Sequence, residues 1–243
     1  MKAVAVVLLA LIPAAALVAQ SAEEIITRME QNQVHDTSRM EGRLIITDRF
    51  GSRTSSFISY ARGADDALIE FTSAGERGQK VLRTRDEVYL FYPDAAELIR
   101  LQGAALRDSM LGSDVSYEDM TGNRALLDTY RVRLAGEETV EDRPTFRVEL
   151  EARGRNVAYP RQTIWVDREL FVMRRAEQFS ANGRLLKEVE VKETMEVSGL
   201  TFPSRMVIRD VLKRNSSTEF VIDTAEVNIA LPRNVFSLES LRW

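Results

Sequence analysis

Apolar and polar residues alternate over most of the chain, in short runs that turn residues separate. The clearest run is TFRVELE at residues 145–151, where Phe146, Val148 and Leu150 would share one face and the charged residues the other. Alternation with period two predicts β-strands that have one apolar and one solvated face. Similar patterns predict strands at residues 40–48, 54–61, 67–72, 80–85, 87–92, 162–167, 170–179, 184–193, 204–211 and 217–229.

The turns between these runs favour antiparallel hairpins. Asn182-Gly183 stands between two alternating runs, which is a strong signal for a β-hairpin. In the run that follows, KEVEVKE at residues 187–193, we expect Val189 and Val191 to face inward and the charged residues to face solvent. The chain therefore offers about ten to twelve antiparallel strands.

Two segments interrupt the alternation and favour helices. Near the amino end, Ser21 and Glu24 match a capping box, and the apolar stripe that follows predicts a helix ending at residues 32–36. The second segment is residues 103–128, where the alternation stops and leucine and methionine recur at the spacing of a short amphipathic turn.

A sheet of so many strands must curl until its apolar concave face is covered. The two helical segments are available as the cover. We therefore expect a mainly β fold: a single curled antiparallel sheet forming an unclosed β-barrel of about 10–12 strands, covered by short helices. No linker or repeat interrupts the pattern, so residues 21–243 are predicted to form one domain.

The amino terminus has the pattern of an export signal. A lysine at position 2 precedes an almost purely apolar stretch at residues 3–17, and small residues follow. This is typical of a secretory signal peptide, here residues 1–20. A retained membrane anchor is the alternative, but the apolar run is shorter than the roughly 20 residues of a span and contains Pro13. Cleavage would fall after Ala19, Gln20 or Ala22.

The chain has no cysteine, which limits both its compartment and its stabilisation. Without a lipobox cysteine the exported protein is not itself a lipoprotein, and we expect it to reside in the periplasm. It must also fold without disulfides, and a mature chain of about 220 residues is long enough to bury a core. The net charge of −4 is spread along the chain, so nothing indicates a nucleic-acid partner.

Candidate catalytic and metal-binding residues are sparse. His35 is the one histidine, and a Ser–His–acid triad or a zinc site would depend on it. Its polar surroundings predict a solvated loop histidine instead. Phosphate-binding and nucleophile-elbow motifs are absent from the sequence. We therefore expect no catalytic residue, no metal site and no cofactor.

The acidic residues of SMLGSDVSYEDM, residues 109–120, allow two interpretations. Asp114, Glu118 and Asp119 are of the types that hold calcium or act as an acid–base pair. The favoured interpretation is capping, with Ser113 or Asp114 as a helix N-cap and the later acids solvated in the next helical turn.

The same stretch carries a family resemblance. Residues 88–119, VYLFYPDAAELIRLQGAALRDSMLGSDVSYED, resemble the bacterial outer-membrane lipoprotein-sorting (LolA-like) family, whose members often carry a segment close to SFMGSDFSYEDL. Residues 164–167 and 182–187 also look like the family, so the resemblance covers essentially the whole mature chain. The basic patch that precedes the motif is reduced here to Arg100 and Arg107, and Val115 replaces the usual aromatic residue.

The resemblance implies an unclosed barrel with a helical lid, and a periplasmic carrier that takes acyl chains of lipoproteins or lipids into a hydrophobic cavity. It also implies an inner-membrane transporter that loads the carrier and an outer-membrane acceptor, and we expect a monomer. The candidate lipid-binding residues of the cavity and lid are Ile25, Met29, Leu44, Ile46, Phe71, Leu90, Tyr92, Leu106, Met110, Leu111, Val115, Tyr117, Phe146 and Val148.

Two further hypotheses stand beside the carrier. The first is a non-enzymatic periplasmic sensor or accessory module of the same fold, which would bind a peptide or glycolipid and a membrane transporter. The second is a lipid hydrolase, which requires a nucleophile with a base, and the sequence offers no convincing pair.

Overall fold

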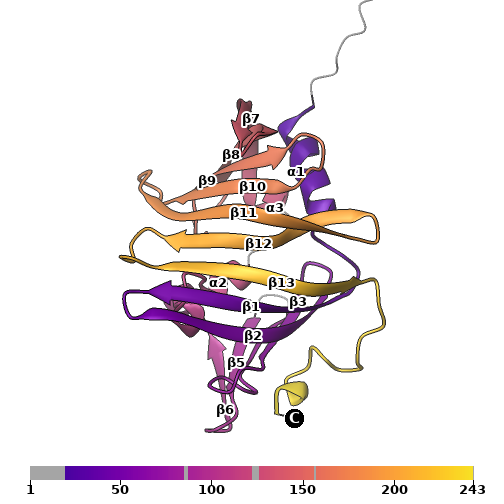
Figure 1. The fold of residues 1–243 in the computed structure, drawn as a ribbon, viewed down its shortest axis with the longest axis vertical. Coiled ribbons are helices and arrows are strands. Elements are labelled where there is room, and N and C mark those ends of the chain that lie inside the picture. The colour runs from indigo at the N-terminus through magenta and orange to yellow at the C-terminus, as the bar shows by residue number, and fades with distance from the viewer. Residues whose placement is uncertain (1–19, 85–86, 122–125, 156, 243) are drawn as a thin grey trace, which may run out of the picture.

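Thirteen antiparallel strands form one continuous sheet in the computed structural model, which describes residues 20–84, 87–121, 126–155 and 157–242 (Figure 1). The strands are β1 (Ser38–Asp48), β2 (Gly51–Arg62), β3 (Asp66–Phe71), β4 (Lys80–Thr84), β5 (Glu87–Tyr92), β6 (Glu97–Leu101), β7 (Tyr130–Val140), β8 (Arg143–Ala152), β9 (Arg161–Asp167), β10 (Met173–Phe179), β11 (Leu185–Val197), β12 (Leu200–Asp210) and β13 (Ser217–Val227).

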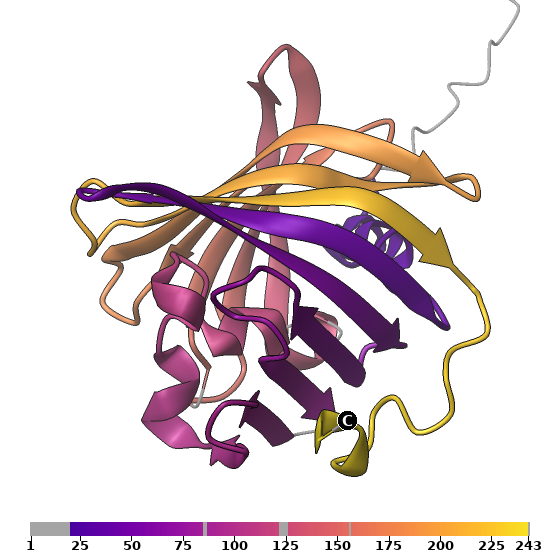
Figure 2. The same ribbon diagram turned by 60° about the horizontal axis from the view of Figure 1, so that its bottom comes forward.

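The strand order places the two edges of the sheet next to each other in sequence. The order is β6-β5-β4-β3-β2-β1-β13-β12-β11-β10-β9-β8-β7, so β1 and β13 pair in the middle and β6 and β7 form the edges. The segment between β6 and β7 therefore has to pass from one edge to the other. Because the sheet is curled, this segment runs across its concave side, as the magenta elements in Figure 2 show. The topology thus makes the central segment a cover of the curl.

The central segment contains short helices and 3-10 turns: η1 (Gly103–Arg107), η2 (Met110–Gly112), α2 (Tyr117–Thr121) and α3 (Leu126–Thr129). Outside this segment, α1 (Ala22–Gln31) precedes β1 and η3 (Glu239–Arg242) lies at the carboxyl end. The predicted capping box is confirmed: the Ser21 hydroxyl accepts from the Glu24 amide, and the Glu24 carboxylate accepts from the Ser21 amide. The helix ends at Gln31 with Asn32 as its C-cap, where the sequence predicted an end. None of the helices among the described residues is long and apolar enough to cross a membrane.

The alternating pattern predicts eleven of the thirteen strands and misses β6 and β7, the two edges. Edge strands contact a neighbour on one side only, and most side chains of these two are partly or fully exposed. Their sequences therefore lack the clear apolar face of an inner strand. The strand predicted at 170–179 begins at Met173, because a turn that includes Phe171, with φ of 52°, precedes it. Most of the predicted signal peptide, residues 1–19, lies outside the described residues.

Apolar side chains pack in three groups. One group joins α1 to β8 and β9, and a second joins β1–β5 to the central segment, both on the concave side. The third lies on the other face of β3–β5, where Val235 and Leu241 of the carboxyl-terminal segment cover Leu68, Leu82 and Phe91. Lys80 fixes this segment by donating from Nζ to the Ser240 carbonyl at 3.1 Å. The sequence pattern did not predict this outer cover.

Candidate ligand-binding cavity

A cavity of about 700 Å³ lies between the concave face of the sheet and the covering helices. Its floor includes a row of cross-strand neighbours that run over four adjacent strands: Ile164, Ala176, Val189 and Ile208. Phe202, Met206, Phe220 and Ile222 of β12 and β13 extend this apolar surface. From above, Met29, Leu106, Val115 and Leu126 close it. The cavity is therefore mainly apolar on its floor and partly apolar on its cover.

A polar row lies beside the apolar row on the same floor. Gln162, Gln178 and Lys187 are cross-strand neighbours on β9, β10 and β11, two residues along each strand from Ile164, Ala176 and Val189. Side chains two residues apart share one face of a strand, about 7 Å apart. Gln162 and Lys187 are 7% and 5% exposed, so this end of the cavity is polar although it is buried.

Lys187 corrects one prediction from the sequence. In KEVEVKE the charged residues were expected to face solvent, but Lys187 is in phase with Val189 and Val191 and faces the cavity. Its ammonium forms an ion pair with Asp119 of α2 and lies 5.5 Å from the centre of the Tyr159 ring. The ion pair explains how the sheet tolerates a buried cation at this position.

Tyr159 completes the cluster around Asp119. Its hydroxyl donates to Asp119 Oδ1 at 2.7 Å, while Lys187 contacts Oδ2. Burial and the neighbouring Asp119 carboxylate both raise the pKa of Tyr159, so the hydroxyl keeps its proton and remains a donor. Through these two contacts α2 is attached to β11 and to the loop before β9. The polar end of the cavity is thereby closed by hydrogen bonds and one ion pair.

Two further carboxyl groups line the cavity. Burial raises the pKa of Glu118, against the lowering effect of Arg107, whose Nε lies 3.6 Å from the Glu118 carboxylate. Burial also raises the pKa of Glu30, against a hydrogen bond from the Leu126 amide at 2.5 Å. Arg107 and Arg100, the remainder of the basic patch, both contact carboxylates, Arg100 with Glu87 at 2.6 Å. Both arginines of the reduced basic patch are therefore paired with carboxylates, and the basic residues that line the cavity are Lys187 and Arg83.

Asp114 is buried, whereas the sequence predicted a solvated cap. It is 2% exposed, and its carboxylate accepts from Ser216 Oγ at 2.8 Å, Thr218 Oγ1 at 2.9 Å and the Asp210 amide at 3.0 Å. The N-cap of α2 is instead Ser116, whose hydroxyl accepts from the Asp119 amide. A short motif cannot tell a cap from an anchor, because the partners of Asp114 lie about one hundred residues further along the chain.

A sharp turn stands at the start of the motif. Gly112 has φ of 69°, which glycine adopts without strain, and Leu111 before it also has a positive φ of 51°. Arg53 of β2 donates to the Leu111 carbonyl, and Lys213 contacts the Ser113 carbonyl and Ser109 Oγ. Residues 109–116 are thus held against the ends of β2, β12 and β13 by polar contacts on two sides.

The structure divides the candidate lipid-binding residues into two sets. Met29, Leu106 and Val115 line the cavity. The others lie in the packed apolar groups and are Ile25, Leu44, Ile46, Phe71, Leu90, Tyr92, Met110, Leu111, Tyr117, Phe146 and Val148. Alternation identifies the concave face, but it does not separate the residues that fill space from those that border a cavity. The wall residues of β10–β13 were not among the candidates. The position of Lys187, in phase with the inward-facing Val189 and Val191, could have indicated a polar group in the cavity.

His35 also differs from its prediction as a solvated residue. It is 8% exposed, its ring centre lies 6.0 Å from that of Phe202, and its Nε2 has no hydrogen-bond partner among the described residues. Across the described ranges, no group of three or more His, Cys, Asp or Glu residues is placed to hold a metal ion.

The burial of His35 predicts a pH effect on stability. Burial lowers its pKa from the ordinary value of 6.5, so the unfolded chain binds a proton at a pH where the folded protein does not. Stability from this group is complete above pH 6.5 and is lost as the pH falls below it. We expect wild type to lose more free energy of unfolding between pH 7 and 5 than His35→Gln, measured by urea denaturation. Both proteins contain the same carboxyl groups, so these groups cannot cause a difference between them. If the free energy of unfolding falls equally with pH in both proteins, His35 does not have a lowered pKa in the folded state.

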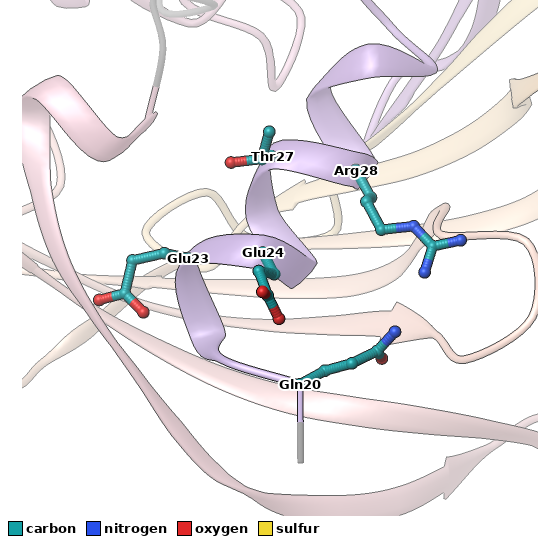
Figure 3. Close-up of a pocket in the computed structure, with 5 residues that line it drawn as sticks. All are labelled: Gln20, Glu23, Glu24, Thr27 and Arg28. Atoms are coloured by element: carbon teal, nitrogen blue, oxygen red, sulfur yellow. The ribbon is translucent and has the colours of Figure 1, made fainter. Parts of the chain in front are cut away.

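A second hollow, of about 490 Å³, lies at the outer side of α1 (Figure 3). Its lining residues are Gln20, Glu23, Glu24, Thr27 and Arg28, all from this one helix and the residues before it. They form the polar side of α1, opposite the buried Ile25 and Ile26. A hollow lined by one polar helix face lacks the enclosing apolar walls of a lipid site, so the cavity under the cover is the candidate site.

Three solved structures share this fold over nearly the whole chain. A DUF1329 family protein from Desulfovibrio piger is 24% identical and covers 90% of this chain and 97% of its own, with a TM-score of 0.84. A domain from Vibrio parahaemolyticus, named for outer membrane lipoprotein sorting, is 18% identical over 91% and 98%, with a TM-score of 0.83. A LolA superfamily protein from Nitrosomonas europaea is 23% identical over 91% and 100%, with a TM-score of 0.77.

These comparisons confirm the predicted class: the chain has the unclosed, antiparallel fold of the LolA superfamily. A family model described as that of an uncharacterized protein matches residues 63–243, and the chain belongs to that family. No curated protein matches the chain.

Proposed function

We propose that this protein is a periplasmic, non-enzymatic carrier that binds the acyl chain of a lipid or lipoprotein in the cavity between sheet and cover. The cavity itself carries the proposal. Its volume of about 700 Å³ falls within the range of about 300–1,000 Å³ that is usual for small-molecule sites. Its apolar floor spans four strands and is backed by a rigid sheet, so the space is built into the fold.

In this proposal, burial of the acyl chain supplies the free energy of binding. Each CH2 group moved from water into the cavity contributes about 0.8 kcal/mol, and no bond has to form or break. Release requires the cover to open. The cover is held by apolar packing, which includes the buried Met110 and Val115, and by polar contacts such as Lys187 with Asp119 and Lys213 with Ser109. The polar contacts can exchange for water at low net cost when the cover opens.

The sequence and the name of one similar protein support the proposed location. The apolar amino-terminal stretch supports export, and the name of the Vibrio parahaemolyticus domain supports a role between the two bacterial membranes. In this proposal the carrier acts as a monomer, receives cargo from an inner-membrane transporter and delivers it to an outer-membrane acceptor.

Transfer between vesicles tests the proposal. Donor vesicles would carry a fluorescent acylated peptide, and acceptor vesicles a quencher, with the purified protein added in increasing amounts. The carrier proposal predicts a transfer rate that rises with protein concentration. Uptake of the probe without transfer would favour the sensor or accessory module. If the protein neither took up the probe nor transferred it, a role in lipid binding would be contradicted.

A further inference from the structure

The polar row on the cavity floor has a fixed hydrogen-bond direction. The Tyr130 hydroxyl donates to the Tyr159 carbonyl at 3.1 Å, so its oxygen accepts the hydrogen bond that it shares with Gln162. The Gln162 amide therefore uses its nitrogen toward Tyr130 and presents its oxygen to the next residue. Gln178 donates from Nε2 to that oxygen at 3.3 Å. The sequence of donors and acceptors thus ends at the Gln178 carbonyl.

The last group in this series of hydrogen bonds is an acceptor without a donor. Gln178 Oε1 is buried and has no hydrogen-bond partner within the described part of the chain, and Gln178 lines the cavity. A buried carbonyl oxygen without a donor is costly, and native structures avoid it unless a ligand or water supplies the missing hydrogen. The polar end of the cavity therefore lacks one N–H or O–H donor.

A donor lies beside this acceptor. Lys187 is the cross-strand neighbour of Gln178, and the Cβ atoms of such pairs are about 5 Å apart. The ammonium group has three N–H donors, and its ion pair with Asp119 uses one of them. The Lys187 side chain is 6% exposed and also lines the cavity. An acceptor and a donor are thus presented side by side to the same ligand group.

We infer that the cavity selects acyl chains joined through an amide, whose N–H reaches Gln178 and whose C=O reaches Lys187. The inference rests on the proposed carrier function and names the ligand group that the polar end recognises. A secondary amide carries one donor and one acceptor next to each other, which complements the pair on the floor. The rest of the chain lies on the apolar row of Ile164, Ala176, Val189 and Ile208.

Other acyl head groups fit this end less well. An ester has an acceptor for Lys187 but no donor for Gln178. A free fatty acid also offers no donor to Gln178, and its carboxylate, which could pair with Lys187, would lie beside the Asp119 and Glu118 carboxylates. The amide is therefore expected to bind more tightly than the ester, which differs from it only by the missing donor.

Two neutral probes of equal chain length test the inference. N-Methylpalmitamide and methyl palmitate differ by an N–H in place of an ester oxygen, and each would compete with a fluorescent acyl probe. We expect wild type to bind the amide about fivefold more tightly than the ester, the value of one net hydrogen bond. In Gln178→Met the preference should disappear, so that the ratio of the two affinities falls to about one. Gln102→Met, at an exposed glutamine outside the cavity, should behave as wild type.

The outcomes separate this inference from the carrier proposal. Equal affinity of wild type for both probes, or a preference that survives in Gln178→Met, would overturn the amide inference alone. Failure of both probes to displace the fluorescent compound would instead contradict acyl binding itself.

Discussion

Replacing Ala176 by phenylalanine is expected to weaken acyl binding roughly fiftyfold while the protein stays folded. Ala176 lies in the middle of the apolar row, 3% exposed but bordering the cavity. A larger side chain there extends into the space that the acyl chain would occupy. Each CH2 group of the acyl chain that is excluded from the cavity costs about 0.8 kcal/mol of binding free energy. Excluding about three CH2 groups therefore lowers the affinity roughly fiftyfold.

A graded series at this position gives the sharper result. Ala176→Val, Ala176→Leu and Ala176→Phe should weaken binding of a fluorescent acyl probe in that order, with unchanged circular dichroism. Ala104→Phe is the matched control, since Ala104 is exposed on η1 and does not border the cavity. If Ala176→Phe binds the probe as tightly as wild type, the acyl chain does not occupy this cavity.

Removing the carboxylate of Asp114 should give the largest loss of stability in the covering segment. Its two oxygens accept hydrogen bonds from Ser216, Thr218 and the Asp210 amide, all in or beside β12 and β13. Asp114→Ala leaves these donors buried without their acceptor. Because each unsatisfied buried group costs about 1–3 kcal/mol, we expect the free energy of unfolding to fall by about 3 kcal/mol.

The matched control for this change is Asp108→Ala. Asp108 is an exposed acid in the same segment, and its loss should cost less than about 0.5 kcal/mol. Urea denaturation gives both values, and hydrogen exchange should show faster exchange of the amides in residues 109–117 of Asp114→Ala. An equal, small effect of both substitutions would mean that Asp114 does not anchor the cover.

The parts of the fold that were predictable from sequence are those that local chemistry determines. The capping box of Ser21 and Glu24 involves residues three positions apart, and the hairpin turn that contains Asn182 and Gly183 lies within residues 180–184. The inner strands were predictable because one face of each packs against the core. The edge strands β6 and β7 were not, because a strand with one neighbour and little burial has no strong pattern to read.

The candidate site was less predictable because it depends on distant partners. Asp114 and its hydrogen-bond donors are 96 to 104 residues apart, and Lys187 and Asp119 are 68 apart. Nothing local distinguishes such an acid from an ordinary helix cap. His35 was assigned to solvent from its polar neighbours in sequence, whereas in the fold it contacts Phe202, far along the chain. The resemblance to the LolA-like family predicted a cover and a cavity, but it did not predict most of the residues that border the cavity.

Native mass spectrometry of the protein purified from the periplasm without detergent tests acyl binding most directly. The account predicts a species heavier than the polypeptide by one acyl-bearing molecule, which lipid extraction would release and identify. The same preparation of Ala176→Phe should show the polypeptide alone. A wild-type protein that shows only the polypeptide mass, and that takes up no added fluorescent fatty acyl probe, would contradict the central claim that the cavity holds an acyl chain.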